Sequence, residues 1–578
     1  MLPQKNPVNP DRLIVIPLDD RIVNYECPQL LGEAGGVEVQ MPPKDWLGTP
    51  WRTGQMENIS NWLAEAVQAG ASGIIVALDT LGYGGLVNSR RSSDTAEEVM
   101  ARLQILGELK AQRPALSILA YNILMRINRS NDAEEEKPYV AVYGSRLFEM
   151  SVCADKQNMA VASPEDQTRL AALQAEIPPE IVADYLAGRA RNHQVNRAML
   201  DWTKAGVFDY LIIAQDDTVD YGWNIAEARR LRQEAREKRL AAKVSVYPGA
   251  DDIGMLLVGR FLASRRGFQP RIWTRYSSAR HAQVITDYED RPMEELVKAH
   301  LGPLGGILAE SPDQADIWLY LNTPAEIQGN GPDQYVVSVD EAYIRAQPPA
   351  VQQAFRNYLA YPGLQDTLRE MHTPQRNGVE FARSLQQALQ SGKTCALADV
   401  AFVNASDKAL GDTLCELTDI AQLAAYGGWN TAGNTLGTVI GQAVIRHLQR
   451  LYGATPQMLA AHARFLFLRF VEDYLYQSHW RTKFMLETLP QIGARPTTGK
   501  LEPEHLPQVL ELLVQQLRAA ANSLAQEAFV GKSIAAGETA IVLEALRIDG
   551  LSLPWGRLFD LTLDIGCEYR VHTQEDRQ

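Results

Sequence analysis

The 578-residue sequence lacks the features that mark several large classes of protein. Its five cysteines are far apart and none belongs to a CxxC pair, so neither a disulfide framework nor a zinc knuckle is expected. Its nine histidines show no HxH or HxxxH spacing, which argues against catalytic zinc. No apolar run reaches the roughly 18 residues of a membrane-spanning helix.

Positive charge is also in the minority, with 56 Lys and Arg against 70 Asp and Glu, and the formal net charge is −14. We therefore expect neither a nucleic-acid nor a membrane partner. The N-terminal stretch MLPQKNPVNPDR lacks the charged and apolar regions of a signal peptide. The expectation is a cytoplasmic protein, although a secreted chain trimmed of its leader would have the same sequence. Nothing in the sequence indicates the oligomeric state.

What the sequence does contain is a regular alternation of short apolar runs and segments of helix length, up to about residue 450. The expected helices are 55–69, 94–112, 224–240, 251–264, 339–359 and 432–452. The expected strands are 13–18, 37–41, 73–78, 117–122, 210–214, 243–247, 271–276, 316–321, 396–403 and 422–426. Strands that alternate with helices predict parallel pairing and an α/β fold.

The fold class predicted from this pattern is a (β/α)8 barrel-like parallel sheet core, with two doubly wound α/β domains as the alternative. Residues 1–450 form the expected α/β catalytic region, with a helical insertion at 130–200 and an internal boundary near 322–338. Residues 451–578 form a C-terminal helical region with a short β tail. Within it, segment 456–530 is expected to pack as a cap without contributing chemistry.

Acidic and amide side chains follow many of the expected strands. In parallel α/β folds ligands bind at the carboxyl ends of the strands, so these side chains are the candidate site, although Asp is also a common helix cap. We predict that Asp19, Asp79, Asp216, Asp217 and Asp252 line one cavity. The full set of strand-end candidates is Asp19, Asp20, Arg21, Asp79, Asp216, Asp217, Asp251, Asp252, Asn404 and Asp407.

The paired acids of 209-DYLIIAQDDTVDYGWN-224 are the most specific of these features. Neighbouring side chains of a regular strand face opposite sides, but where the strand ends and the chain turns, Asp216 and Asp217 can reach one pocket. Two close carboxylates raise the pKa of one of them, which suits a general acid at neutral pH. Tyr221 or Trp223 is a candidate wall for a bound ring.

A second informative segment is 426-YGGWNTAGNTLG-437, which follows a short strand and opens a helix. Trp429 offers a stacking face for a sugar ring or a base, and Asn430 and Asn434 can both donate to and accept from hydroxyls. The alternative interpretation is a helix-entry turn with Trp429 in the core and Asn430 as the N-cap. No cofactor is required by either interpretation.

From IPLDDR through ALDTLGYGGLVNSRR, YPGADD, RYSS, YEDRP and GWNTAGNTLG, nearly the full chain resembles the bacterial family known as domain of unknown function 4127. This resemblance implies no activity. The polar residues of these motifs join the candidate substrate-binding residues: Asn88, Arg90, Tyr247 and Arg275.

A more distant resemblance is to β-N-acetylglucosaminidases of the O-GlcNAcase type, which are (β/α)8 barrels. It is carried by 212-IIAQDDT-218, 272-IWTR-275, 402-FVNASD-407 and 429-WNTAGN-434, in the same order as in that family. Arg275 stands where that family has Gly, and Thr431 where it has Pro. The resemblance implies substrate-assisted hydrolysis, in which Asp216 orients the substrate acetamido group and Asp217 is the acid/base, while Asn404 and Asn430 bind hydroxyls.

Three functions are therefore carried forward. The first is a carbohydrate-active hydrolase with paired aspartates, acting on a small molecule or an oligosaccharide and possessing β-N-acetylhexosaminidase activity by the resemblance. The second is a metal-dependent hydrolase, isomerase or lyase that binds Mg²⁺ or Ca²⁺ through Asp19, Asp79, Asp216 and Asp252. The third is a non-catalytic sugar- or nucleotide-binding protein.

Overall fold

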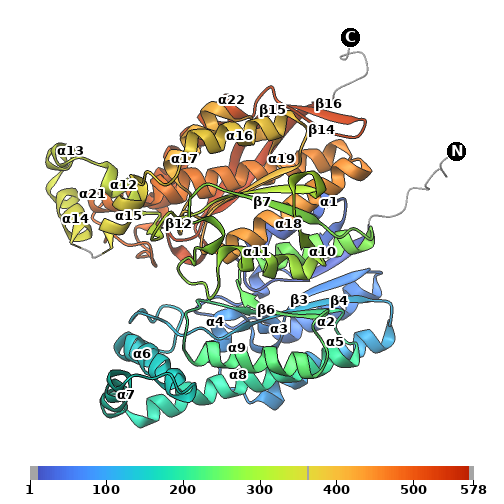
Figure 1. The fold of residues 1–578 in the computed structure, drawn as a ribbon, viewed down its shortest axis with the longest axis vertical. Helices are drawn as coiled ribbons and strands as arrows, with labels where there is room; N and C mark the ends of the chain where they lie inside the picture. The colour runs from blue at the N-terminus through green and yellow to red at the C-terminus, as the bar shows by residue number, and fades with distance from the viewer. Residues whose placement is uncertain (1–10, 361–362, 572–578) are drawn as a thin grey trace. The chain divides into compact units, whose positions relative to one another are not determined.

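The computed structural model describes residues 11–360 and 363–571, and residues 1–10 of the expected leaderless N-terminus lie outside this part. The chain divides into two compact units. The first comprises the chain up to Asp20, Val37–Leu257 and Tyr288–Asp290. The second comprises Arg21–Gly36, Val258–Asp287 and the chain from Arg291 onward. Each unit is built on its own parallel sheet (Figure 1).

The first unit contains an open six-stranded parallel sheet with the order β2-β1-β3-β4-β5-β6. Its strands β3 and β5 are mostly apolar and buried along their whole length, as expected where helices cover a parallel sheet. The strands are β1 (Arg12–Ile16), β2 (Glu38–Gln40), β3 (Gly73–Ala77), β4 (Ser117–Leu124), β5 (Tyr210–Gln215) and β6 (Val244–Pro248).

The helices of the first unit include a layer in which α2, α5, α8 and α9 contact one another in succession, and α8 and α9 run along the sheet in Figure 1. Capping boxes of Thr95 with Glu98 and of Ser163 with Asp166 fix where α5 and α7 begin. The helices are α2 (Met56–Gln68), α3 (Leu78–Tyr83), α4 (Leu86–Arg91), α5 (Ala96–Gln112), α6 (Val140–Asn158), α7 (Pro164–Glu176), α8 (Pro179–Ala205) and α9 (Trp223–Glu237).

The second unit contains a five-stranded parallel sheet with the order β13-β11-β9-β7-β8. Helix α18 packs on β9, β11 and β13, and α16 lies on the other side of the sheet in Figure 1. Strands β10 and β12 lie between strands of this sheet in the sequence and form a separate two-stranded parallel pair. The strands are β7 (Arg271–Tyr276), β8 (Ile307–Leu308), β9 (Ile317–Asn322), β10 (Gly329–Asn330), β11 (Cys395–Asp399), β12 (Phe402–Val403) and β13 (Ala425–Gly427).

The remaining helices and strands belong mostly to the second unit, with α10 crossing from one unit to the other. A three-stranded antiparallel sheet of β14 (Ser533–Ala536), β15 (Thr539–Ser552) and β16 (Thr562–Val571) packs against α19 and α22. The α-helices are α1 (Glu26–Gly35), α10 (Ile253–Arg265), α11 (Met293–Leu301), α12 (Asp333–Ser338), α13 (Glu341–Ala346), α14 (Pro349–Leu359), α15 (Leu364–Met371), α16 (Gly378–Gln390), α17 (Lys408–Leu417), α18 (Ala432–Tyr452), α19 (Pro456–Arg469), α20 (Arg481–Lys483), α21 (Leu489–Gln491) and α22 (Leu506–Ala528). Two π-helical stretches, η6 (Phe470–Trp480) and η7 (Phe484–Thr488), flank α20.

The α/β class and the parallel pairing predicted from the sequence are confirmed, but a closed barrel is not. The strands form two separate open sheets, as in the alternative prediction, because β6 ends the first sheet and β7 pairs with β8 and β9. Numbered from its first strand, the first sheet has the order 2-1-3-4-5-6, and the second, read from β8, has the order 2-1-3-4-5 of flavodoxin-like doubly wound folds. Across the residues that the structure describes, no helix is long and apolar enough to cross a membrane.

The compact units follow a different division from the one expected at residues 450 and 322–338. Segment 322–338 connects β9 to β11, which are neighbours in one sheet, so it lies inside the second unit. The chain after residue 450 belongs to that same unit because α19 packs on α1 and on β13. The region 130–200 does form helices, α6, α7 and much of α8, and α6 and α7 enclose an apolar cluster of their own.

The loop after β10 gives a test of packing in the second unit. Gly331 donates its N–H to Val403 O at 2.7 Å, and a Cβ there would lie 2.4 Å from the Ala405 Cβ and 2.8 Å from the Ala405 nitrogen. Gly331→Ala should therefore destabilise the protein by about 1–3 kcal/mol. Gly188→Ala, in the open interior of α8, is the matched control and should stabilise by roughly 0.5–1 kcal/mol. Denaturant unfolding of both variants measures this, and an unchanged Gly331→Ala midpoint would contradict the packing.

Candidate active site

The strand order of the first sheet reverses between β1 and β3, and ligands of such sheets bind at the carboxyl ends beside the reversal. At this point the chain after β1 carries Asp19 and Asp20, while β3 runs directly into α3, which carries Asp79 and Thr80. The Thr80 hydroxyl donates to Pro17 O at 2.6 Å and so ties the two strand ends together. The expected strand-end acids therefore do stand at the reversal point.

Asp79 is buried in this region, with 1% of its surface exposed. Its Oδ2 accepts a hydrogen bond from the Ile123 backbone N–H of β4 at 2.8 Å. Burial raises the pKa of Asp79 from 3.8 to about 7, although the hydrogen bonds from Ile123 and Ser89 and the charge of Arg90 oppose this. Asp79 is therefore poised to exchange a proton near neutral pH.

Tyr121, on β4, is a buried residue on which the charges of several strand-end acids act. Its side chain is fully buried, and among the described residues its hydroxyl has no hydrogen-bond partner. The pKa of Tyr121 is raised well above its usual value, first by burial and then by the charges of four carboxylates: Asp19, Asp79, Asp251 and Asp252. These acids follow β1, β3 and β6, and their charges act together on one buried phenol.

Asp216 and Asp217 follow β5 at the same edge of the sheet. Asp217 has a φ of 49°, so the chain leaves the extended conformation between the two acids. The Asn224 side chain, from the first turn of α9, donates to Asp217 O at 3.1 Å and holds this turn. The break in side-chain alternation that was expected at the end of the strand is therefore present in the backbone.

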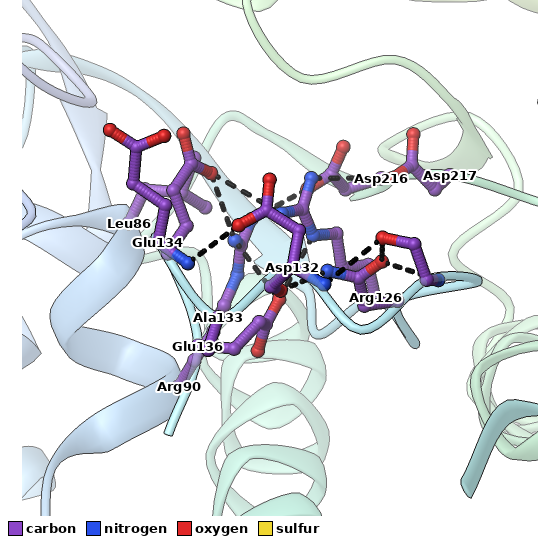
Figure 2. A network of polar contacts seen from close by, with 12 residues as sticks. Leu86, Arg90, Arg126, Asp132, Ala133, Glu134, Glu136, Asp216 and Asp217 are labelled. Carbon is purple, nitrogen blue, oxygen red and sulfur yellow. Dashed lines mark hydrogen bonds and ion pairs between the residues drawn. The ribbon is translucent and has the colours of Figure 1, made fainter. Parts of the chain in front are cut away.

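Arg90 connects the paired acids to the rest of the site. Its side chain is 1% exposed, and Nη2 lies 2.7 Å from Asp216 Oδ2 (Figure 2). Nη1 lies 3.2 Å from Glu135 and 3.4 Å from Glu136. The charge of Arg90 also lowers the pKa of Asp79, so it acts on that acid as well as on the pair.

Arg126 is the second cation of the network and lies beside Asp217, with Nη1 3.3 Å from Oδ2 (Figure 2). It also contacts Glu136 at 3.0 Å and Glu135 at 3.4 Å. Burial would lower the pKa of Arg126, but the charges of Asp217 and Asp216 outweigh burial and raise it well above its usual value. Four carboxylates thus share two guanidinium groups, which leaves an excess of negative charge.

This excess of negative charge affects the pKa of Asp216. Its pKa is raised, first by burial and then by the charge of Asp217, against the opposing charges of Arg126 and Arg90. The sequence predicted a raised pKa within the pair, and the structure places it on Asp216. A carboxyl whose pKa is raised beside a second carboxyl with its own arginine is an arrangement that suits a proton donor.

Several predicted residues of the first unit have other surroundings. Asn88 holds a turn, since its Nδ2 donates to Gly84 O at 3.0 Å and its Oδ1 accepts from Thr53 at 3.2 Å. Tyr247 is buried within β6, and Asp20 is half-buried after β1. Trp223 packs 6.0 Å from the Tyr185 ring against the cluster of α6 and α7, so it does not serve as a free stacking wall.

The remaining candidates, Arg21, Arg275, Asn404, Asp407, Trp429, Asn430 and Asn434, belong to the second unit. Arg21 stacks 4.9 Å over the Trp555 ring and lies 3.6 Å from Asp560. Arg275, on β7, pairs with Glu380 at 2.6 Å at the surface. These two arginines are engaged in local contacts of their own.

Asp407 belongs to a buried polar network at the carboxyl end of the second sheet. Asn322, the last residue of β9, donates to Asp399 at 2.8 Å and to Asp407 at 3.3 Å, and Arg376 lies 3.3 Å from Asp407. Burial and the charge of Asp407 raise the pKa of Asp399 to about 7. Asp407 also caps α17 through the Ala409 N–H, which confirms the cap interpretation, while its role in a site stays a prediction.

The segment after β13 forms a helix-entry turn. Thr431, and not Asn430 as expected, is the N-cap of α18, because its hydroxyl accepts from the Asn434 N–H. Asn430 precedes it with a φ of 69°, and its carbonyl accepts from the N–H of Asn404, whose φ is 64°. Trp429 is 5% exposed with its ring 5.8 Å from Phe559, as in the core interpretation.

Several residues of these networks were not predicted from the sequence. The run DAEEEK reads as a solvated surface segment, yet Glu135 and Glu136 turn toward the two arginines. Asp399 had a visible signal, a lone acid inside the apolar run 396-ALADVAFV-403. Tyr121, on β4, and Arg126, just after it, carried none, because single residues of these kinds are also ordinary core or surface positions.

Within residues 11–360 and 363–571, no group of three or more His, Cys, Asp or Glu side chains is arranged to hold a metal ion. All five cysteines are free, in agreement with the expected lack of disulfides. Taken together, fold and site define an α/β protein with two parallel sheets and a buried carboxylate–arginine network at the end of the first.

The chain belongs to the family described as "Protein of unknown function (DUF4127)", whose sequence model matches residues 13–564. The resemblance noted from the motifs is thereby confirmed. Neither the curated proteins nor the solved structures contain a match. The resemblance to O-GlcNAcase-type enzymes has no support from these comparisons.

The raised pKa of Asp79 gives a test by protonation linkage. Asp79 loses its proton near pH 3.8 when unfolded and near pH 7 when folded, so its contribution to stability falls as the pH rises through this window, by about 4 kcal/mol in total. Asp79→Asn removes the buried charge. Its stability relative to wild type should be higher at pH 8 than at pH 5, as measured by denaturant unfolding. The same difference at both pH values, as expected for the exposed control Asp220→Asn, would show that Asp79 titrates normally.

Proposed function

We propose that the protein is a hydrolase that cleaves a glycosidic bond of a hydroxyl-rich substrate by general acid–base catalysis, with Asp216 and Asp217 as the reacting carboxylates. One observation carries the proposal. The second of the two adjacent acids, Asp217, has a left-handed backbone conformation, and each acid has its own arginine, yet the pKa of Asp216 is raised. Paired titratable groups whose environments differ in this way are typical of acid–base sites.

In this proposal the roles within the pair are the reverse of those that the sequence resemblance implied. Asp216 gives its proton to the leaving oxygen as the glycosidic C–O bond breaks. Asp217, beside Arg126, provides the negative charge that stabilises the positive anomeric carbon or orients the attacking group. The attacking group is the substrate's own acetamido oxygen or a water molecule, and water finally returns a proton to Asp216.

The chemistry around the pair favours a substrate rich in hydroxyl groups. A hydroxyl both donates and accepts, so it can bind between a carboxylate such as Glu135 and a guanidinium such as Arg126. Tyr121 adds a buried phenol without a partner among the described residues. The same features also suit a sugar-binding protein without catalysis, which is the second candidate, because arginine-held carboxylates bind hydroxyls equally well.

The test is a panel of aryl glycosides, beginning with aryl N-acetyl-β-hexosaminides, assayed with wild type, Asp216→Asn and Asp217→Asn. Loss of the proton donor should slow substrates with poor leaving groups by about 10²–10⁴-fold and acidic phenols much less. Asp217→Asn should slow both kinds alike, because it removes charge stabilisation from every transition state. The rate of Asp216-dependent hydrolysis should fall as the pH rises through the raised pKa of that carboxyl.

The exposed Asp220, on the same loop, supplies the matched control Asp220→Asn, which should leave all rates unchanged. Each assay is repeated with a chelator, and loss of activity there would favour the metal-dependent alternative. Saturable sugar binding by calorimetry with no turnover of any substrate would favour the binding protein. Full activity in both site variants would refute the role of the pair.

A further inference from the structure

Arg481 lies buried in the second unit without the partners that a buried charge requires. It is 2% exposed and begins α20, the short α-helical turn between the two π-helical stretches η6 and η7. Among the described residues its Nε and Nη1 have no hydrogen-bond partner, and Nη2 makes one long bond of 3.4 Å to Asn404 O. Buried charges are normally paired, so these unpaired donors call for an explanation.

The two acids whose charges act on Arg481, Asp560 and Asp333, have other partners. Asp560 lies 2.5 Å from Arg557, and Asp333 accepts from Tyr358 at 2.6 Å and from Asn330 at 2.8 Å. Burial lowers the pKa of Arg481 in spite of these acids.

A second buried arginine of the same segment, Arg469, does have carboxylate partners. Arg469 is 3% exposed, and it is paired with Glu472 at 2.8 Å and with Asp473. The fold therefore supplies carboxylates to one buried arginine of this segment and leaves the other without one.

The surroundings of Arg481 are those of a binding site for a negative group. Its guanidinium lies 5.2 Å from the centre of the Phe559 ring, and the Trp429 ring packs 5.8 Å from the same ring. The Trp429 Nε1–H is buried and likewise has no partner within the described part of the chain. The groups left unpaired on these two side chains are N–H donors, which suit a ligand that only accepts.

The backbone nearby places this group where α/β proteins bind ligands. Asn404 follows β12, and Trp429 and Asn430 follow β13, so the loops around Arg481 leave the carboxyl ends of parallel strands. The Asn404 N–H donates to Asn430 O at 3.0 Å, which joins the two loops. Both asparagines have positive φ, a conformation that persists only where the surroundings hold it.

We propose that Arg481, together with the Trp429 indole N–H, binds an oxyanion of a small molecule, either a carboxylate or a phosphate group. Guanidinium groups recognise both, through charge and through parallel N–H bonds. The site uses residues of the second unit only, so this proposal does not depend on the role of the acid pair in the first unit.

The test is the melting temperature of the full chain titrated with sodium phosphate and, separately, with sodium acetate, each against sodium chloride at equal ionic strength. Binding to the folded state raises the melting temperature in proportion to the logarithm of the free anion concentration. In wild type we expect such a rise with phosphate, acetate or both, and the anion that acts identifies the chemical class.

Two variants separate a binding arginine from a structural one. Arg481→Met should abolish the anion response without lowering the melting temperature in chloride, because it removes a buried charge that no carboxylate pairs with and keeps an unbranched apolar side chain over the Phe559 ring. Arg481→Lys keeps the charge but loses the fork, so it should bind the active anion at least about tenfold more weakly. Arg464→Met, from a half-buried arginine of α19, is the control and should respond as wild type does.

An equal response in wild type and Arg481→Met would overturn the proposal, as would a wild type that responds to neither anion beyond chloride. If Arg481→Met does not fold, Arg481→Lys decides the matter by isothermal titration. An unchanged affinity in Arg481→Lys would then assign the anion to another site.

Discussion

The site at the end of the first sheet depends on Arg90, a nearly fully buried cation that pairs with carboxylates from two parts of the chain. Its ion pair with Asp216 fixes the end of β5, and its contacts with Glu135 and Glu136 fix the segment after β4. A buried guanidinium that lost one of these carboxylates would keep its desolvation cost, so the contacts maintain one another. The positions of the paired acids therefore follow from one charge in the interior.

Much of the fold was predictable because apolar runs mark buried parallel strands regardless of what they pair with. Every strand expected up to residue 426 has a counterpart near its predicted limits. Closure into a barrel was not predictable, since it depends on which strands are neighbours. The run 396–403 shows a local limit, because Asp399 ends β11 within what looked like a single strand.

The candidate site was predictable where acids follow strands directly, as at Asp79, Asp216 and Asp252. It was not predictable where the partner comes from a distant segment. Glu135 and Glu136 sit in a polar run that resembles a solvated loop, and only the position of Arg90 in space explains their burial. The pairing of Arg469 was predictable, because Glu472 and Asp473 follow it at helical spacing, whereas Arg481 has no acid three or four residues away on either side.

The buried acids also change the net charge of the folded protein. Asp79 and Asp399 have pKa values of about 7, and Glu472 of about 8, where burial in each case is the largest cause. At neutral pH these groups hold protons in the native chain that they release in the unfolded chain. The native protein therefore takes up protons as it folds, and it carries less negative charge than the formal value of −14. Its electrophoretic mobility depends on the fold as well as on the composition.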